Sequence, residues 1–122
     1  MSLIYHITTR PAWDHAQSIG VYTADSLISQ GFIHCSTREQ ITRVADVVFR
    51  GQSDLVLLCV DSAKLKAELR FEPPDNQIPA HHVQEELFPH LYGLLNTDAV
   101  VKVIDFPART DGTFALPPEL DA

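Results

Sequence analysis

The chain has 122 residues, of which 45% are hydrophobic and 20% are charged, and its formal net charge is −7 at pH 7. This length and balance predict a single globular domain over residues 1–122 and exclude a chain that is mainly disordered. The acidic balance excludes an extended nucleic-acid-binding surface, which needs an excess of lysine and arginine. The longest apolar run, residues 55–60, is far shorter than the about 20 residues that cross a bilayer, so no membrane association is predicted. Because no secretory signal is visible after Met1, the expected location is cytoplasmic.

The first half of the chain predicts two strands, each followed by helical segments. β-Branched and aromatic residues over 3–8 indicate a strand, and apolar residues then recur at helical spacing over about residues 10–19. A helical turn over residues 25–30 precedes a compact strand over residues 32–35. The clearest helix follows, because residues 36–39 fit a capping box, in which side chains bind the free N–H groups at a helix start.

The second half predicts four strands and one long loop. The apolar run 55–60 is typical of a central strand that is buried on both faces. Further strands are expected over residues 69–72, 88–93 and 99–106, the last two paired as a hairpin. The polar stretch at about residues 73–87 is expected to be a loop or lid, and the acidic C-terminal tail at about 115–122 is expected to fray after a packed Phe114. Together these elements predict an α+β fold with a mostly antiparallel, curved sheet and short helices.

Three histidines lie in apolar, strand-like segments: His6, His34 and His90. An imidazole both donates and accepts hydrogen bonds and titrates near neutral pH, so several in one pocket suit ligand orientation or acid–base chemistry. The alternative is that each histidine is structural or points to solvent. No metal is expected, because the chain has neither paired cysteines nor histidines at helical spacing.

Two cysteines, Cys35 and Cys59, fall inside apolar runs and are predicted to be buried, reduced thiols. A hydrolase with Cys35 as nucleophile stays open as an alternative, but it requires an exposed and acidic thiol. His34 cannot serve as its base, because neighbours along a strand face opposite sides.

An anion site is predicted where the helix after residues 32–35 begins. The free N–H groups after Ser36, together with Arg38, favour a phosphate or carboxylate there. Arg10 lies just beyond His6 in the sequence and is expected to join this site.

Four segments of the chain carry a family resemblance: Ile-Tyr-His-Ile-Thr at 4–8, Gly-Phe-Ile-His-Cys-Ser at 31–36, Phe-Pro-His-Leu-Tyr-Gly at 88–93 and Asp-Gly-Thr-Phe at 111–114. With these motifs the chain closely resembles the domain of unknown function 952 family, over nearly its whole length. That family has no established activity to transfer.

A more distant resemblance concerns the order of the motifs. The chain has, in order, a strand with Tyr-His-x-Thr, a helix, a strand with His-x-Ser, a helix and an apolar strand that ends in Val-Asp. This order is similar to that of the ADP-ribosyltransferase superfamily, and most to its RNA 2'-phosphotransferase branch. The resemblance implies a split sheet whose cleft binds NAD, ADP-ribose or a related nucleotide phosphate, with NAD as the implied cofactor. Its partner would be this small nucleotide-type ligand, and the oligomeric state is not predicted.

The resemblance also implies roles for particular residues. His6, with Thr8 of the same motif, would bind a ribose hydroxyl, and the phosphate would be held by His34, Ser36, Arg38 and Arg10. The reactive ribose would be oriented by His90 or Tyr92, and the positive charge of the transition state would be stabilised by Glu72 or Glu86.

Two departures weigh against catalysis. Ile7 stands where the superfamily commonly has glycine, and the late catalytic glutamate has no certain counterpart. Whether the chain is an enzyme, an ADP-ribosyl- or 2'-phospho-transferase, therefore stays open. The alternative is a non-catalytic ligand-binding or protein-interaction domain of the same fold.

Overall fold

The structure is a computed structural model that describes residues 2–74 and 86–121, so the predicted lid at 73–87 lies almost entirely outside the described residues. The strands are β1 (Leu3–Thr9), β2 (Val21–Tyr22), β3 (Ile33–His34), β4 (Leu55–Asp61), β5 (Glu68–Glu72), β6 (Phe88–Tyr92), β7 (Leu95–Asn96) and β8 (Val100–Asp105). The α-helices are α1 (Arg10–Ile19), α2 (Asp25–Ser29) and α3 (Ile41–Val48). The described strands form open sheets in the orders β1-β4-β8, β3-β6-β5 and β2-β7, with antiparallel pairing throughout. The α+β prediction is thereby confirmed.

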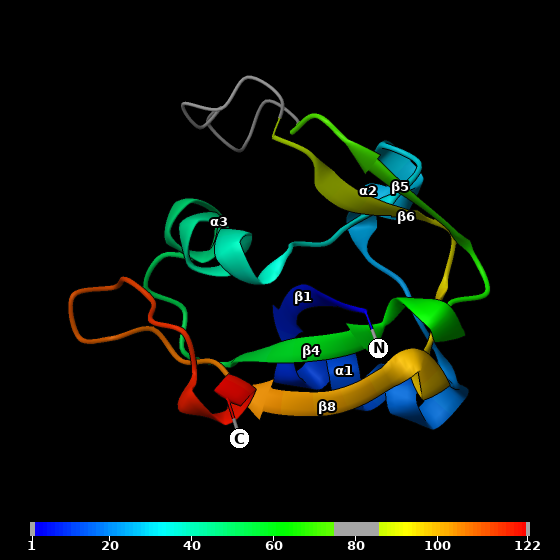
Figure 1. The fold of residues 1–122 in the computed structure, drawn as a ribbon. Coiled ribbons are helices and arrows are strands. Elements are labelled where there is room, and N and C mark those ends of the chain that lie inside the picture. Colours follow the sequence, from blue (N-terminus) through cyan, green and yellow to red (C-terminus); the bar gives the residue numbers. More distant parts are fainter. Residues whose placement is uncertain (1, 75–85, 122) are drawn as a thin grey trace.

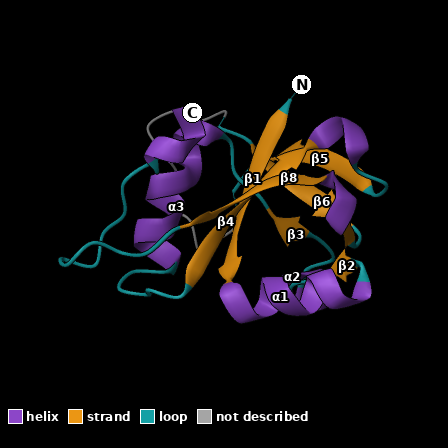
Figure 2. Ribbon diagram, turned by 90° about the horizontal axis from the view of Figure 1, so that it is seen from below, coloured by secondary structure: helices purple, strands orange, loops and turns teal. Residues whose placement is uncertain are grey.

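The central strand β4 is buried on both faces, as its apolar run predicts. Its even-numbered residues Val56, Leu58 and Val60 pack into one cluster, which includes Trp13 of α1. Leu55, Leu57 and Cys59 of the same strand pack into a second cluster with Ile41 and Ala45 of α3, and Phe114. Figure 2 shows α1 and α3 on separate sides of this sheet. Burying both faces fixes β4 between β1 and β8.

Helix α1 forms where local signals predict it. The Thr9 hydroxyl accepts a hydrogen bond from the Ala12 backbone N–H at 3.2 Å, which satisfies one free donor at the helix start. Gly20 ends the helix in the left-handed conformation, with φ at 88°. Trp13 and Ala16 are the buried residues of its inner face.

The helical segment that leads into α3 starts one residue later than predicted. The capping box consists of Thr37 and Gln40, not Ser36 and Glu39, and a 3-10 turn over Arg38–Gln40 precedes α3. The backbone of Ser36 is held elsewhere, because its N–H and C=O both pair with Tyr5 of β1 at 2.7 and 2.8 Å. The C=O of an N-cap residue accepts the first hydrogen bond of the helix. Because the Ser36 C=O accepts from Tyr5, that bond is made instead by the Thr37 C=O, which accepts from the Gln40 N–H at 3.0 Å.

The predicted hairpin between residues 88–93 and 99–106 is wrong. Strand β6 pairs with β3 and β5, whereas β8 pairs with β4. Between them, the short strand β7 pairs with β2, and a 3-10 turn over Thr97–Ala99 redirects the chain. The two segments therefore belong to different sheets.

The C-terminal segment is more ordered than predicted. Phe114 is buried as expected, but Pro118–Asp121 forms a 3-10 turn in place of a frayed tail. Lys102 Nζ donates to the Glu119 carbonyl at 2.6 Å, and Leu120 packs against the second cluster. No helix in the described part of the chain is long and apolar enough to cross a bilayer.

Backbone hydrogen bonds join the two larger sheets at the end of β3. The Tyr5–Ser36 bridge joins β1 to the segment after β3, and the Cys35 N–H donates to the Pro89 carbonyl of β6 at 3.0 Å. In Figure 1, α3 lies on one side of this junction, while α2, β5 and β6 lie on the other. The junction brings the His6 and His34 segments together.

Candidate functional site

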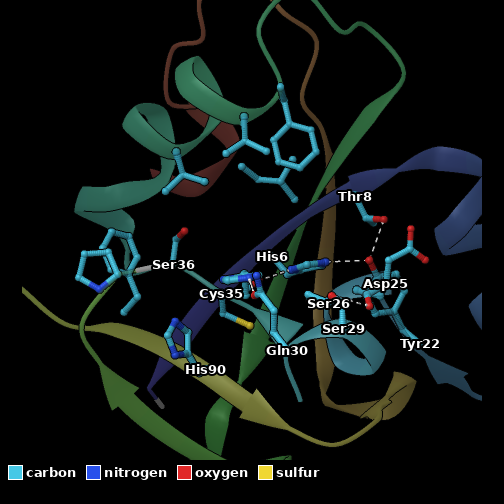
Figure 3. A pocket seen from close by; sticks show the side chains of 18 of the residues that line it. His6, Thr8, Tyr22, Asp25, Ser26, Ser29, Gln30, Cys35, Ser36 and His90 are labelled. Carbon is cyan, nitrogen blue, oxygen red and sulfur yellow. Dashed lines mark hydrogen bonds between the residues drawn. The ribbon is translucent and has the colours of Figure 1, made fainter. Parts of the chain in front are cut away.

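A cavity of about 480 Å³ lies at this junction, within the range of about 300 to 1,000 Å³ that is usual for small-molecule sites. Five predicted site residues line it: His6, Thr8, His34, Ser36 and His90. Polar residues of α2 and its C-terminus complete one wall, namely Asp25, Ser26, Ser29 and Gln30 (Figure 3). The opposite wall is apolar and consists mainly of Val44, Val48, Phe49, Pro74 and Phe88.

His6 makes two internal hydrogen bonds at the floor of this cavity. Its Nδ1 lies 2.5 Å from the His34 carbonyl oxygen, and its Nε2 lies 2.7 Å from the Tyr22 hydroxyl. The Tyr22 hydroxyl also lies 3.0 Å from Thr8 Oγ1, so Thr8, Tyr22 and His6 form a continuous chain of hydrogen bonds (Figure 3). Both nitrogens of His6 are thus used inside the protein, which leaves neither for the ribose hydroxyl that the resemblance implies.

The charge state of His6 follows from its burial. The ring is 8% exposed, and burial disfavours the charged imidazolium, lowering the pKa of His6 from 6.5 to about 4. His6 is therefore neutral at pH 7. Because the His34 carbonyl can only accept, Nδ1 carries the single ring proton and Nε2 accepts the proton of Tyr22.

A second group of predicted residues shares one face of the sheet β3-β6-β5. His34 and His90 lie directly opposite each other across the β3–β6 pair, with ring centroids 5.5 Å apart. The Phe32 ring stacks on His90 at 4.0 Å with an interplanar angle of 10°. His34 Nε2 in turn lies 2.6 Å from Gln30 Oε1 at the end of α2. The cavity thus lies between this face of the sheet and the hydrogen-bonded residues Thr8, Tyr22 and His6.

Glu72 and Tyr92 lie behind His90 and are not among the residues that line the cavity. Glu72 Oε1 accepts hydrogen bonds from the Tyr92 hydroxyl at 2.6 Å and from His90 Nδ1 at 2.9 Å. These two hydrogen bonds, from Tyr92 and then His90, lower the pKa of Glu72 below its ordinary value. Arg70 lies over the Tyr92 ring at 4.4 Å and forms an ion pair with Glu68 at the surface.

The predicted arginines are not part of this cavity. Arg10 forms an exposed ion pair with Asp105 of β8, and Arg38 begins the 3-10 turn without lining the cavity. Glu86, the other predicted carboxylate, forms an ion pair with Arg43. Among the described residues that line the cavity, Asp25 is the only aspartate, glutamate, lysine or arginine. Neither Arg10 nor Arg38 therefore adds positive charge to the lining of this cavity.

Comparison with known proteins assigns the chain to a family. Residues 7–103 match the model of a family described as protein of unknown function, DUF952. The chain belongs to this family. It is 34% identical to protein CC0527 of Caulobacter crescentus over 99% of this chain and 100% of that chain, and the crystal structure of that protein aligns with a TM-score of 0.83. The crystal structure of a double mutant aligns at 0.82 with 33% identity over the same shares of both chains. The solution structure aligns at 0.69 with 34% identity over 95% of this chain and 94% of that chain. No curated protein matches.

The thiol hydrolase that the sequence left open does not fit this DUF952 protein. Cys35 lines the cavity but is only 4% exposed, and burial raises the pKa of its thiol to about 12. A nucleophilic cysteine must be a thiolate, so Cys35 lacks the acidity that the mechanism requires. Over residues 2–74 and 86–121, no three His, Cys, Asp or Glu side chains are grouped to hold a metal ion.

Sequence analysis missed several polar residues of the site in this DUF952 protein, among them Tyr22, Asp25 and Gln30. Tyr22 follows the end of α1 and reaches His6 only because β2 pairs with β7 beside the core. Gln30 precedes the left-handed Gly31, and its side chain is directed at His34. The one signal that could have identified Tyr22 is that a buried tyrosine needs a hydrogen-bond partner for its hydroxyl.

Proposed function

We propose that this protein binds a small, uncharged ligand of nucleoside size, with hydroxyl groups at one end and an apolar ring at the other. The proposal is supported by the cavity of about 480 Å³, one wall of which is polar and the other apolar. Sites of this kind bury the apolar part of a ligand and orient it through a few polar groups. His34 and Ser36 supply such groups from one segment, and His90 supplies another from β6.

The proposal keeps the nucleoside part of the predicted NAD or ADP-ribose ligand and leaves out its pyrophosphate. A ribose and its base match the polar and apolar walls, whereas a pyrophosphate needs cationic partners when it is buried. The described lining holds no lysine or arginine, and the carboxylate of Asp25 repels an anion. A nucleoside therefore fits the cavity better than NAD or ADP-ribose.

The geometry favours binding over ADP-ribosyl transfer. The carboxylate of a transferase must face the reacting sugar to stabilise its positive charge. Here Glu72 is separated from the cavity by His90, and Glu86 is held by Arg43 and by Gln40. The non-catalytic ligand-binding domain, which the sequence kept as an alternative, is thus the better supported form.

Calorimetric titration with adenosine, ADP-ribose and NAD tests this function. We expect saturable binding of adenosine, with both phosphate-bearing compounds at least about tenfold weaker because their charge has no counterion. The variant Ser36→Ala removes a cavity hydroxyl without changing the backbone, and should weaken adenosine binding by about threefold to tenfold. Ser53→Ala, at an exposed position outside the cavity, is the matched control.

Two results would overturn the proposal. Tighter binding of ADP-ribose or NAD than of adenosine would show that the ligand is anionic. Absence of binding by all three compounds would remove the nucleoside-sized ligand.

A further inference from the structure

His90 is held more rigidly than a surface histidine. Its ring is 3% exposed, Phe32 stacks on one face at 4.0 Å, and Glu72 holds Nδ1 at 2.9 Å. Figure 3 shows His90 at the cavity, at the side where Ser36 also lies. A ring fixed by stacking and by one directed hydrogen bond has little freedom to turn, so it presents the same edge to a ligand each time.

The hydrogen bonds around Glu72 decide which nitrogen carries the proton. Glu72 Oε1 already accepts the Tyr92 hydroxyl at 2.6 Å, and an ionised carboxylate can only accept. His90 Nδ1 must therefore be the donor, so in the neutral ring Nε2 is left with a lone pair. This Nε2 makes no hydrogen bond with a described residue, and His90 lines the cavity. His6 differs, because both of its nitrogens already have partners.

We propose that His90 is a specificity-determining residue whose Nε2, unpaired among the described residues, accepts a hydrogen bond from a hydroxyl group of the ligand, and that Glu72 is its positioning residue. This inference rests on the proposed function. It adds that the ligand must carry a hydrogen-bond donor where it faces Nε2 of His90. Tyr92 braces Glu72 from the outer side, and Arg70 covers the Tyr92 ring. An acceptor with no alternative partner discriminates strongly, because a ligand without a donor there leaves a buried nitrogen unpaired.

The tautomer of His90 is the first measurement, and it needs no ligand. Two-bond ¹H–¹⁵N NMR correlation of the free protein at pH 8 distinguishes a protonated Nδ1 from a protonated Nε2. We expect protonated Nδ1 in the wild type and in Glu68→Gln, a control on the same strand whose carboxylate binds Arg70 instead of His90. Glu72→Gln can donate to Nδ1 through its amide, so the population should shift toward protonated Nε2. Tyr92→Phe leaves the Glu72–His90 bond in place and should keep the wild-type tautomer.

Binding of adenosine and its 2'-, 3'- and 5'-O-methyl derivatives is the second measurement. Methylation removes one hydroxyl donor at a time. In the wild type, one of the three derivatives should bind at least about tenfold more weakly than adenosine. In Glu72→Gln this ratio should fall to within about threefold, because Nε2 no longer presents a lone pair.

The outcomes separate this inference from the proposed function. Protonated Nε2 in the free wild type, or the same discrimination in wild type and Glu72→Gln, would overturn the role of Glu72 and His90 even if adenosine binds. Absence of adenosine binding would overturn the proposed function and, with it, the ligand contact at Nε2. In that case the NMR measurement of the His90 tautomer alone decides whether Glu72 positions His90.

Discussion

Acid sensitivity of the buried His6 gives the most direct test of the site geometry. Burial lowers the pKa of His6 to about 4 in the folded protein, against 6.5 in an exposed chain. Between these two values the unfolded chain holds about one more proton than the folded protein, so the free energy of unfolding falls as the pH falls. Each pH unit corresponds to about 1.4 kcal/mol, which gives a total loss of about 3 kcal/mol between pH 6.5 and pH 4. Above pH 6.5 this contribution is fully present.

The assay is urea unfolding at pH values from 7.5 to 4, followed by the fluorescence of Trp13, the single tryptophan of the chain. Trp13 is 4% exposed, so its emission should report loss of the core. His6→Gln replaces the titrating ring with a neutral amide. Carboxylates also titrate at the acidic end, and subtracting the variant's profile from that of the wild type removes their contribution.

The matched control is His15→Gln, because His15 is an exposed residue of α1. We expect the wild type and the control to share the steep loss of stability below pH 6.5, and the His6→Gln profile to be flatter there. Equal slopes in the wild type and in His6→Gln would refute the argument. So would an NMR titration in which His6 of the folded protein protonates near pH 6.5.

Three further changes test other parts of the structure. Tyr22→Phe leaves the buried Nε2 of His6 without its donor and should lower the free energy of unfolding by about 1 to 3 kcal/mol, measured by urea unfolding at pH 7. Gly93→Ala places a Cβ 2.7 Å from the Ala67 Cβ at a backbone φ of 156°, which favours glycine, and should destabilise by about 1 to 3 kcal/mol; an unchanged urea unfolding midpoint would contradict the clash. Cys35, buried with a pKa of about 12, should react with iodoacetamide only after unfolding, and modification of the native protein detected by mass spectrometry would contradict its burial.

The elements that the sequence predicts well are those with local causes. Helix α1 needs only the Thr9 hydroxyl at its start and Gly20 at its end, and both act within a few residues. Strand β4 consists mainly of a continuous apolar run, which is typical of a strand that is buried on both faces. The helix start after β3 lies one residue later than predicted because a distant partner, Tyr5, donates to the Ser36 C=O and keeps it from accepting the first hydrogen bond of the helix. A local pattern cannot show that competition.

The candidate site shows the same division between local and long-range causes. Its three histidines and Ser36 were identified because such residues are unusual inside apolar strands, and tertiary structure places them around one cavity. Their roles were decided by partners far along the chain. Tyr22 engages Nε2 of His6, whereas Glu72 engages only Nδ1 of His90.

The sequence alone therefore determined the residue types of the site, the helix signals and the buried central strand, because side-chain chemistry and backbone preferences act over a few residues. Only the tertiary structure decided that β6 joins β3 and β5, that Arg10 and Arg38 stay away from the cavity, and which histidine nitrogen remains available. These outcomes depend on strand pairing and on hydrogen bonds between residues that lie 16 to 28 positions apart in the sequence. The energies of such contacts are set by the assembled core and are not encoded in any single segment.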